Sequence, residues 1–405
     1  MLNTIDLFVG CGGLSEGFEQ SRKYKMIGAV EWEPSPVKEL RNHLKNRWGI
    51  QDSEERVLQF DIQRTEELFN GWKDKKFGES KGLDALVGNR QLDVIIGGPP
   101  CQAYSVAGRI RDEHGMREDY RNYLFESYLK VVQHYKPRVF VFENVPGILS
   151  AKPGDGSVRI IDLIQKAFAD AGYAVLPDLS NAIIDMTEYG VPQNRKRIII
   201  LGVSKEHYGD KAEAMVEKFY SSYLPEYKIE KKATVRDAIG DLPKLRPLDE
   251  PISYLGRKLS HSVSDPLING HISRFHNKRD IELFKFLEED IASGRMKYTS
   301  AKSLKTLYTK LTGKTSNVHK YYVLRWDEPS NLIPAHLFKD GLRHIHPDPE
   351  QARTITVREA ARLQTFPDNY YFNCSQTDAF KMIGNAVPPL FAKKVAYAIY
   401  HLIQE

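Results

Sequence analysis

The sequence predicts an α/β protein built around an open sheet. Short apolar segments at 4–9, 26–30, 57–60, 93–96 and 138–142 alternate with amphipathic or polar stretches. Each apolar segment ends abruptly in glycine, acidic or polar residues, as buried strands of such sheets do. Ligands of open α/β sheets bind at the carboxyl ends of the strands, so we expect the functional site at this edge.

Length and composition are those of a soluble globular protein. The chain has 405 residues, is 41% hydrophobic and 27% charged, and carries a net charge of +5, which is compatible with a polyanionic partner. The sequence has no apolar run of membrane-spanning length and no signal peptide. Cys11, Cys101 and Cys374 are too widely spaced for a disulfide framework or a zinc site. We therefore expect no metal and a reducing, cytoplasmic setting.

A glycine-rich turn, residues 10–13, joins the first strand to a helix. Such a turn lets a ligand approach the backbone closely, although many glycine turns are merely tight. The spacing departs from the dinucleotide fingerprint because Ser15 occupies the position of its third glycine. The turn alone is therefore weak support for a nucleotide site.

The ends of the next two strands strengthen that interpretation. The second strand ends in Glu31 and Trp32, and the third in Asp61 and Ile62. An acid about 20 residues after the glycine turn is the usual partner of ribose hydroxyls, and an indole offers a face to a base. Together, the three strand ends predict an adenosine-type pocket.

Cys101 lies at the mouth of a Gly-Gly-Pro-Pro corner that follows the strand 93–96. A free cysteine is often packed and inert, and this stretch alone does not distinguish that role from a nucleophile. Glu143 directly follows the strand 138–142. It could be a helix cap or, beside a strand-end cysteine, a proton donor.

Three polar side chains alternate in the segment 190–197. Gln193, Arg195 and Arg197 have a period of two, which would place them on one face of an extended segment. They could form a solvated basic edge or a set of fixed donors directed into the site.

The remaining segments complete the expected layers. We predict strands at 173–179, 182–185 and 198–203, and helices at 123–135, 160–171, 280–291, 353–368 and 390–403. The segment 280–291 is the one clear helix predicted in the middle of the chain, and Thr356 is expected at the entry to helix 353–368. The segment 68–92 is expected to be a helix end and a surface excursion without a function.

The order of these motifs resembles that of the cytosine-5 DNA methyltransferases. The matching segments are Asp6–Gly13, Glu31–Trp32, Asp61, Gly97–Ser105, Phe142–Gly147, Gln193–Arg197, Thr356–Asp368 and Ile383–Pro389. They cover about the first half of the chain and its last fifty residues. Pro-Pro-Cys-Gln, Glu-Asn-Val and Gln-x-Arg-x-Arg in this order are highly specific.

The resemblance implies a Rossmann-like, S-adenosylmethionine-dependent methyltransferase domain with a smaller inserted target-recognition domain. The catalytic domain would be discontinuous, comprising 1–204 and 384–405, with target recognition by 205–352 and a bracing segment at 353–383. The residues implied in cofactor binding are Phe8, Gly10, Cys11, Gly12, Gly13, Leu14, Glu31, Trp32, Asp61, Ile62, Pro100, Leu124, Asn385, Ala386 and Val387.

The resemblance also assigns catalytic roles. Cys101 would add to carbon-6 of cytosine, and Glu143 would protonate or hydrogen-bond nitrogen-3 and the exocyclic amine. Arg197 would hold oxygen-2, while Arg195 would support the thiolate or the ring. Two nearby arginines would lower the pKa of the Cys101 thiol. The residues do not identify the base that removes the carbon-5 proton.

Base flipping in the family implies further contacts with DNA. The segment 102–119, with Gln102, Ser105 and Arg109, is expected to close over the duplex as a mobile loop. Residues 291–346 hold ten Lys or Arg against three Asp or Glu, with aromatic residues between them, as expected for a surface that meets phosphates. A solvated basic face would give the same composition. His344 and His346 suggest a metal only weakly, because no Cys or acid cluster accompanies them.

We therefore expect a monomeric, bacterial restriction-modification enzyme acting on double-stranded DNA, with a cognate restriction endonuclease in the same system and no membrane partner. A transfer-RNA cytosine methyltransferase is the main alternative, but its Cys-Phe-Thr signature is missing. The altered glycine spacing argues against a nicotinamide oxidoreductase. Intact Cys101, Glu143 and Arg197 argue against a non-catalytic DNA-binding relative.

Overall fold

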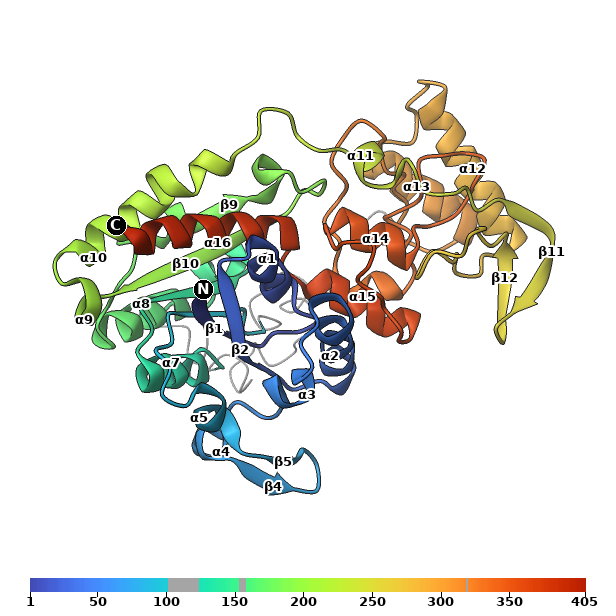
Figure 1. Cartoon of the computed structure of the whole chain (residues 1–405). Coiled ribbons are helices and arrows are strands. Elements are labelled where there is room, and N and C mark those ends of the chain that lie inside the picture. Colours follow the sequence, from blue (N-terminus) through green and yellow to red (C-terminus); the bar gives the residue numbers. More distant parts are fainter. Residues whose placement is uncertain (101–123, 153–157, 318–319) are drawn as a thin grey trace. The chain divides into compact units, whose positions relative to one another are not determined.

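The computed structural model describes residues 1–100, 124–152, 158–317 and 320–405 (Figure 1). The chain forms two compact units. The first comprises Met1–Tyr189, Lys196–Glu230 and Ala386–Glu405, and the second comprises Gly190–Arg195 and Lys231–Asn385. No helix of the described residues has both the length and the apolarity to cross a membrane.

A central sheet organises the first unit. Within the described residues it has eight strands in the order β3-β2-β1-β6-β7-β10-β8, and β9 pairs with β10. The strands are β1 (Leu2–Leu7), β2 (Tyr24–Glu31), β3 (Val57–Gln59), β6 (Val94–Gly97), β7 (Val139–Asn144), β8 (Tyr173–Ala174), β9 (Ile183–Asp185) and β10 (Lys196–Ser204). The pairs from β3 to β7 are parallel, and β10 is antiparallel to its neighbours. The strand order reverses beside β1, which is where such sheets bind ligands.

The helices of the first unit flank this sheet. They are α1 (Gly13–Ser21), α2 (Pro34–Trp48), α3 (Ser53–Arg56), α4 (Thr65–Asn70), α5 (Gly82–Val87), α7 (Leu124–Tyr135), α8 (Ile160–Asp170), α9 (Lys205–Tyr208), α10 (Lys211–Lys218) and α16 (Pro389–Gln404). A hairpin of β4 (Trp72–Asp74) and β5 (Gly78–Ser80) projects from the same unit (Figure 1).

Helices α1 and α16 pack closely because α1 presents glycines to its partner. A Cβ on Gly17 would lie 2.4 Å from the Ala392 Cβ, and one on Gly13 would lie 2.2 Å from the Val387 carbonyl oxygen. The two helices come from opposite ends of the chain. This packing brings Ala386 and Val387 to the glycine turn after β1.

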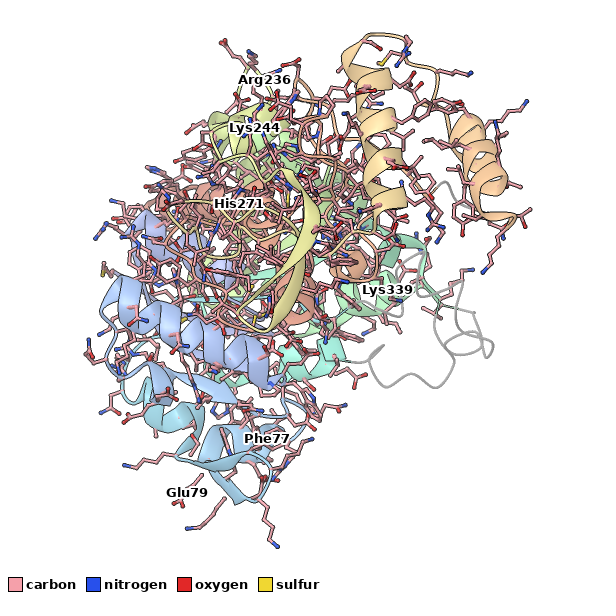
Figure 2. All side chains as sticks on the ribbon, turned by 90° about the vertical axis from the view of Figure 1, so that its right-hand side faces the viewer. Phe77, Glu79, Arg236, Lys244, His271 and Lys339 are labelled. Carbon is pink, nitrogen blue, oxygen red and sulfur yellow. The ribbon has the colours of Figure 1, made fainter. Side chains whose placement is uncertain are left out.

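The second unit contains α11 (Val235–Ile239), α12 (Lys278–Ala292), α13 (Ala301–Thr312), α14 (Val357–Leu363), α15 (Gln376–Asn385) and a hairpin of β11 (Pro247–Tyr254) and β12 (Arg257–His261). Its packing includes a buried network around the Arg353–Glu359 ion pair, whose side chains are 0% and 1% exposed. His271, labelled in Figure 2, lies in the same unit, where its Nδ1 is within hydrogen-bond distance of Thr356 Oγ1 at 3.2 Å.

Two predicted boundaries and the predicted number of helices in the middle of the chain differ from the structure. The predicted strand 173–179 stops at Ala174, because Asp178 caps the 3-10 turn Leu179–Ala182 by accepting a hydrogen bond from the Ser180 amide. The predicted helix 353–368 is shorter, spanning Val357–Leu363, and Thr356 caps it in a capping box with Glu359. The prediction of one clear middle helix was wrong, because α13 follows α12.

The compact units also divide differently from the predicted domains. Residues 205–230 belong to the first unit, where α10 buries Ala212, Met215 and Val216. Residues 190–195 and 353–385 belong to the second. The chain therefore leaves the first unit near Glu230 rather than at residue 204, and the functional roles of the two units stay predictions.

Candidate active site

The turn after β1 is held by a carboxylate from β2. The Gly10 amide donates to Glu31 Oε2 and the Glu33 amide to Glu31 Oε1, both at 2.8 Å. Burial raises the pKa of Glu31, while these backbone donors oppose the rise. Each carboxylate oxygen retains acceptor capacity beyond one hydrogen bond. Glu31 therefore shapes the turn and can still accept ribose hydroxyls.

The glycine turn leaves open space for a ligand. A Cβ on Gly10 would meet nothing within 4 Å, and its φ of 55° favours glycine. Phe8, two residues earlier, has a φ of 57°, a backbone angle that residues other than glycine rarely adopt. Such strain gathers at ligand sites. These features fit a ligand that approaches the backbone, as the predicted cofactor would.

Ser15 shows why the third glycine of the dinucleotide fingerprint is missing. Its hydroxyl donates a 2.6 Å hydrogen bond to Asp6 Oδ2 beneath the turn. Burial raises the pKa of Asp6 to about 7, although the hydrogen bonds from Ser15 lower it. A glycine at position 15 would leave this buried carboxyl group without that donor, so the departure in sequence has a structural cause.

Aromatic side chains surround the ends of β2 and β3. Trp32 is 45% exposed, and the Lys76 ammonium lies 3.9 Å from its ring centroid. Phe77 packs edge-on against both Trp32 and Phe60, with centroids 5.7 and 5.2 Å apart. Asp61 follows Phe60 and accepts from the Gln63 amide. Of the predicted adenosine-binding residues, Trp32 thus belongs to an aromatic group with Phe77 and Phe60, and Asp61 directly follows Phe60 in the chain.

The hairpin residues Lys76 and Phe77 were missed from the sequence. Asp74 Oδ1 accepts both of their amides, which orders the turn between β4 and β5. Phe77 is labelled on this hairpin in Figure 2. In the sequence, the only indication of this hairpin was an adjacent lysine and phenylalanine between Gly71 and Gly78. Polar surface segments of this kind usually have no function.

The other predicted cofactor residues lie at several places in the chain. Cys11, Leu14 and Ile62 are buried, and Leu124 is buried at the start of α7. Ala386 and Val387 lie beside Gly13, so the C-terminal motif does return to the glycine turn. Pro100 is exposed, and Asn385 is the exposed last residue of the second unit.

Glu143 and Arg197 form the best-defined polar pair at the sheet edge. Arg197 Nε lies 3.0 Å from Glu143 Oε1, and the two side chains are 12% and 11% exposed. Strands β7 and β10 position them, because Ile199 is opposite Glu143 in the antiparallel register. The arginine also donates to the Lys196 carbonyl at 2.8 Å. This is a fixed, desolvated carboxylate-guanidinium pair.

The Pro-Pro corner reaches the same pair. A Cβ on Gly98 would lie 2.6 Å from Glu143 Oε2, so a larger residue there would displace the carboxylate. The Asn144 side chain donates to the Pro99 carbonyl at 3.3 Å. The backbone that leads into position 101 is thereby held beside the carboxylate. Cys101 itself lies outside the described residues, as do Gln102, Ser105 and Arg109.

Gln193 and Arg195 do not share a compact unit with Arg197. Gln193 is fully buried in the second unit, where it donates to Gln364 and accepts from the Ile333 amide at 2.9 Å. Arg195 donates to the carbonyls of Ile333 and Gly384 in the same unit. These two side chains hold loops of the second unit together. Gln193, Arg195 and Arg197 are more buried than the exposed Asn194 and Lys196, so the predicted period of two is present, and their action as one set of donors stays a prediction. A catalytic role for Arg195 stays a prediction.

The two histidines that weakly suggested a metal have ordinary partners. His344 Nε2 lies 3.1 Å from the Leu332 carbonyl oxygen, and His346 Nδ1 accepts from the Asp348 amide at 3.1 Å. Burial lowers the pKa of His344 to about 4 and that of His346 to about 3. Both are neutral, hydrogen-bonded interior histidines.

The fold and this sheet edge define the class as a Rossmann-like methyltransferase. Residues 2–401 match the family described as C-5 cytosine-specific DNA methylase. The chain is 34% identical to the type II methyltransferase M.Bpa9945I of Bacillus paralicheniformis, over 98% of each chain. It is 31% identical to the type II methyltransferase M.AgeI of Thalassovita gelatinovora, covering 98% of this chain and 99% of that protein.

Solved structures agree on the fold. A candidate DNA modification methyltransferase encoded within an E. coli prophage matches with a TM-score of 0.65 at 24% identity, covering all of both chains. The S. pombe Dnmt2 methyltransferase matches with a TM-score of 0.55 at 15% identity, covering 100% of this chain and 99% of that one.

The chain belongs to the C-5 cytosine-specific DNA methylase family and is a cytosine-5 DNA methyltransferase. The family and these type II relatives favour this function over the transfer-RNA alternative.

Proposed function

We propose that the protein transfers a methyl group from S-adenosylmethionine to carbon-5 of a flipped cytosine in a specific duplex sequence. The observation that carries this mechanism is the Glu143–Arg197 pair beside the Gly98–Pro99 backbone. Cys101 is two residues beyond Pro99. In this proposal the corner leads the chain to the nucleophile from the edge where the carboxylate and the guanidinium are fixed.

The chemistry assigns each group a task. The Cys101 thiolate would form a bond to carbon-6, and the ring electrons would move to carbon-5. Carbon-5 would then take the methyl group as the methyl–sulfur bond of the donor breaks and S-adenosylhomocysteine leaves. Glu143 hydrogen-bonds nitrogen-3 and the exocyclic amine, and Arg197 binds oxygen-2, so that negative charge does not build up in the ring. Loss of the carbon-5 proton and expulsion of the thiolate restore the aromatic ring and free the enzyme.

The first unit offers a site for S-adenosylmethionine, which supplies an electrophilic methyl group. The residues of this unit that would hold it are the 10–13 turn, Glu31, Trp32, Asp61, Ala386 and Val387. The open backbone at Gly10 and the exposed face of Trp32 fit an adenosine that rests on backbone and indole. The same residues would orient the methyl group toward the Glu143–Arg197 edge.

The proposed partner is double-stranded DNA, with base flipping to reach the site. Relatives named type II methyltransferases suggest a restriction-modification system with a cognate endonuclease. A monomer in the bacterial cytoplasm is the simplest setting for such an enzyme.

Transfer of labelled methyl groups from S-adenosylmethionine tests the proposal. Duplex DNA should be labelled at carbon-5 of cytosine, and bisulfite sequencing should place the label within one short sequence. Labelling of transfer RNA in preference to DNA would reverse the substrate assignment. Isothermal titration of S-adenosylmethionine measures cofactor binding separately from the reaction.

Glu143→Gln should reduce the methyl-transfer rate by about 10²–10⁴-fold, the usual contribution of a positioned acid or base. The variant keeps the side-chain volume but removes the charge opposite Arg197 and the proton that Glu143 can donate. Single-turnover kinetics with bound DNA measures the step, and S-adenosylmethionine affinity should stay near that of the wild type. Glu213→Gln, at an exposed ion pair on α10, is the matched control. A rate within twofold of the wild type would refute the role of Glu143.

A further inference from the structure

Helix α13 and the loop before it carry an unusual charge. From residue 291 to residue 326 the sequence has eight Lys or Arg and no Asp or Glu. Five of these side chains lie between 295 and 310. An acid-free segment of this length in a chain with 53 acidic residues marks a surface with a particular electrostatic task.

Helix α13 is anchored by one face and presents its lysines on another. Leu304 and Leu307 are buried in a cluster with Phe284 and Leu287 of α12. Lys302 and Lys310 are exposed. Eight residues of helix separate these two lysines, about 12 Å at 1.5 Å per residue. The apolar contacts therefore fix two cations on a rigid element.

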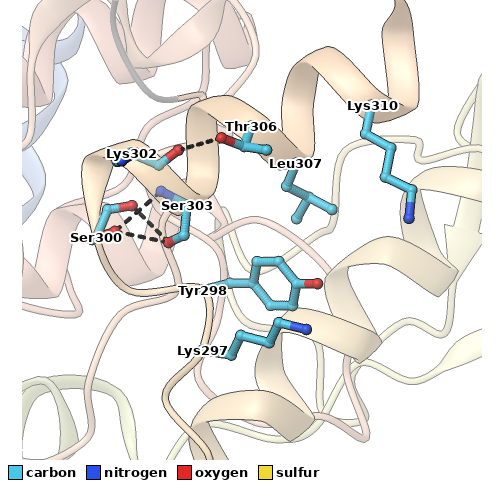
Figure 3. Close-up of a pocket in the computed structure, with 8 residues that line it drawn as sticks. All are labelled: Lys297, Tyr298, Ser300, Lys302, Ser303, Thr306, Leu307 and Lys310. Atoms are coloured by element: carbon cyan, nitrogen blue, oxygen red, sulfur yellow. Dashed lines mark hydrogen bonds between the residues drawn. The ribbon is translucent and has the colours of Figure 1, made fainter.

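The loop before α13 adds a third cation beside them. Lys297, Lys302 and Lys310 line a hollow of about 370 Å³, together with the hydroxyl-bearing residues Ser300, Ser303 and Thr306 (Figure 3). The Tyr298 amide donates to Asp290 at the end of α12, and its ring packs on Phe286. The loop is thus tied to the helix pair, and ammonium and hydroxyl groups share one concave face.

These lysines differ from three exposed lysines of the first unit. There, Lys166, Lys205 and Lys218 pair with Asp170, Glu213 and Glu405 at 2.5–2.9 Å. In the part of the chain that the structure describes, no carboxylate lies within 4.0 Å of the Lys297, Lys302 or Lys310 ammonium. Lysines without a carboxylate partner around one hollow are complementary to an anionic, oxygen-rich partner.

We propose that α13 and residues 295–300 bind the sugar-phosphate backbone of the DNA substrate and do not read its bases. The inference rests on the proposed action on duplex DNA. The spacing of about 12 Å between Lys302 and Lys310 matches the width of the major groove, so the two can contact phosphates across it. Lysine makes point-charge contacts with phosphate. The hydroxyl hydrogens of Ser300, Ser303 and Thr306 are donated within α13 and its cap, so the lysines make the phosphate contacts. Such contacts position the enzyme without carrying sequence information.

The test uses the full chain and two matched triple variants. One combines Lys297→Gln, Lys302→Gln and Lys310→Gln, and the control combines Lys166→Gln, Lys205→Gln and Lys218→Gln. Both remove three positive charges from exposed positions, and circular dichroism confirms that both fold. Affinity for two duplexes of unrelated sequence is measured between 50 and 200 mM salt.

The α13 variant should lose about tenfold or more in affinity for both duplexes alike. Its plot of log affinity against log salt should be shallower by about 2 to 3, since each phosphate contact contributes about 0.9 to the slope. The control should match the wild type. Equal slopes in all three proteins, or no duplex binding by the wild type, would overturn the proposal.

Methylation separates this inference from the proposed function. The α13 variant should methylate the same cytosines as the wild type at high DNA concentration and low salt. A changed set of methylated cytosines would mean that α13 reads bases, which contradicts the proposal. Normal methylation with unchanged salt dependence would disprove phosphate binding by α13 and leave the enzyme assignment intact. If the wild type transfers no methyl group but the salt slopes still differ, the proposed function is disproved and the phosphate-binding surface is supported.

Discussion

Replacement of Cys101 by alanine is expected to abolish methyl transfer to duplex DNA while leaving the binding of S-adenosylmethionine and DNA intact. Carbon-5 of cytosine is a poor nucleophile until a thiolate adds to carbon-6, so removal of the sulfur removes the covalent route. We expect a loss of at least about 10³-fold in the single-turnover rate, which corresponds to about 4 kcal/mol in the activation free energy. Labelled methyl transfer measures the rate, and titration calorimetry measures both affinities.

Covalent trapping gives this prediction a second readout. DNA with 5-fluorocytosine at the target cannot lose a carbon-5 proton, so the wild type should form an adduct that survives denaturing electrophoresis. Cys101→Ala should form none. Cys374→Ala is the matched control, because Cys374 lies in the second unit, and it should trap normally. Adduct formation by Cys101→Ala would disprove the assignment of the nucleophile.

Glu359→Gln is expected to destabilise the second unit by about 3–5 kcal/mol, the usual cost of removing one partner from a buried ion pair. Arg353 makes two hydrogen bonds of 2.7 Å to the two Glu359 oxygens. The same carboxylate accepts from the Thr356 amide at 2.7 Å in the capping box of α14. A neutral amide would leave the Arg353 charge buried without a counter-charge.

Urea unfolding, followed by hydrogen exchange in peptides of the second unit, measures this effect. Glu250→Gln is the matched control, since the Glu250 and Lys278 side chains are 81% and 74% exposed. Exposed pairs contribute about 0–1 kcal/mol. A change below 1 kcal/mol in Glu359→Gln would show that the buried pair contributes no more than a surface pair.

The stability of the second unit should fall steeply as the pH is lowered from 6.5 toward 4. Burial lowers the pKa of His261 to about 4 and that of His276 to about 3, as it does for His344 and His346. In this window the unfolded chain binds protons that the folded chain does not, so stability decreases with acidification. Urea midpoints at pH 7.5, 6.0, 5.0 and 4.5 should fall in that order. A constant midpoint would contradict the neutral, buried state of these histidines.

Local chemistry explains why much of the sheet edge could be predicted from sequence. The end of a strand is marked in the sequence by an abrupt change from apolar residues to polar residues or glycine. This change located Glu31 at the end of β2, Asp61 after β3 and Glu143 near the end of β7. Capping residues are equally local, and Thr356 lies where the sequence placed it. The resemblance to a known family supplied the roles of these residues.

Long-range packing explains what the sequence did not show. The period of two at 193–197 is real, but Gln193 and Arg195 are buried by partners more than 130 residues away. Periodicity along a segment carries no information about where the chain passes between compact units. Helix α13 was also missed, although Ser300 caps it and Gly313 ends it, because its polar face weakens the apolar period.

The division of residues 190–197 between the two units has a consequence for exchange of modules among relatives. A chimaera made by transplanting only residues 231–385 would take Ile333, Gln364 and Gly384 from the donor while keeping Gln193 and Arg195 from the recipient. If the donor loops did not match the recipient, the buried Gln193 amide and the buried Arg195 guanidinium would lose hydrogen-bond partners. The six residues Gly190–Arg195 therefore belong with the second unit, so a chimaera that exchanges this unit has to exchange two separate stretches of the chain.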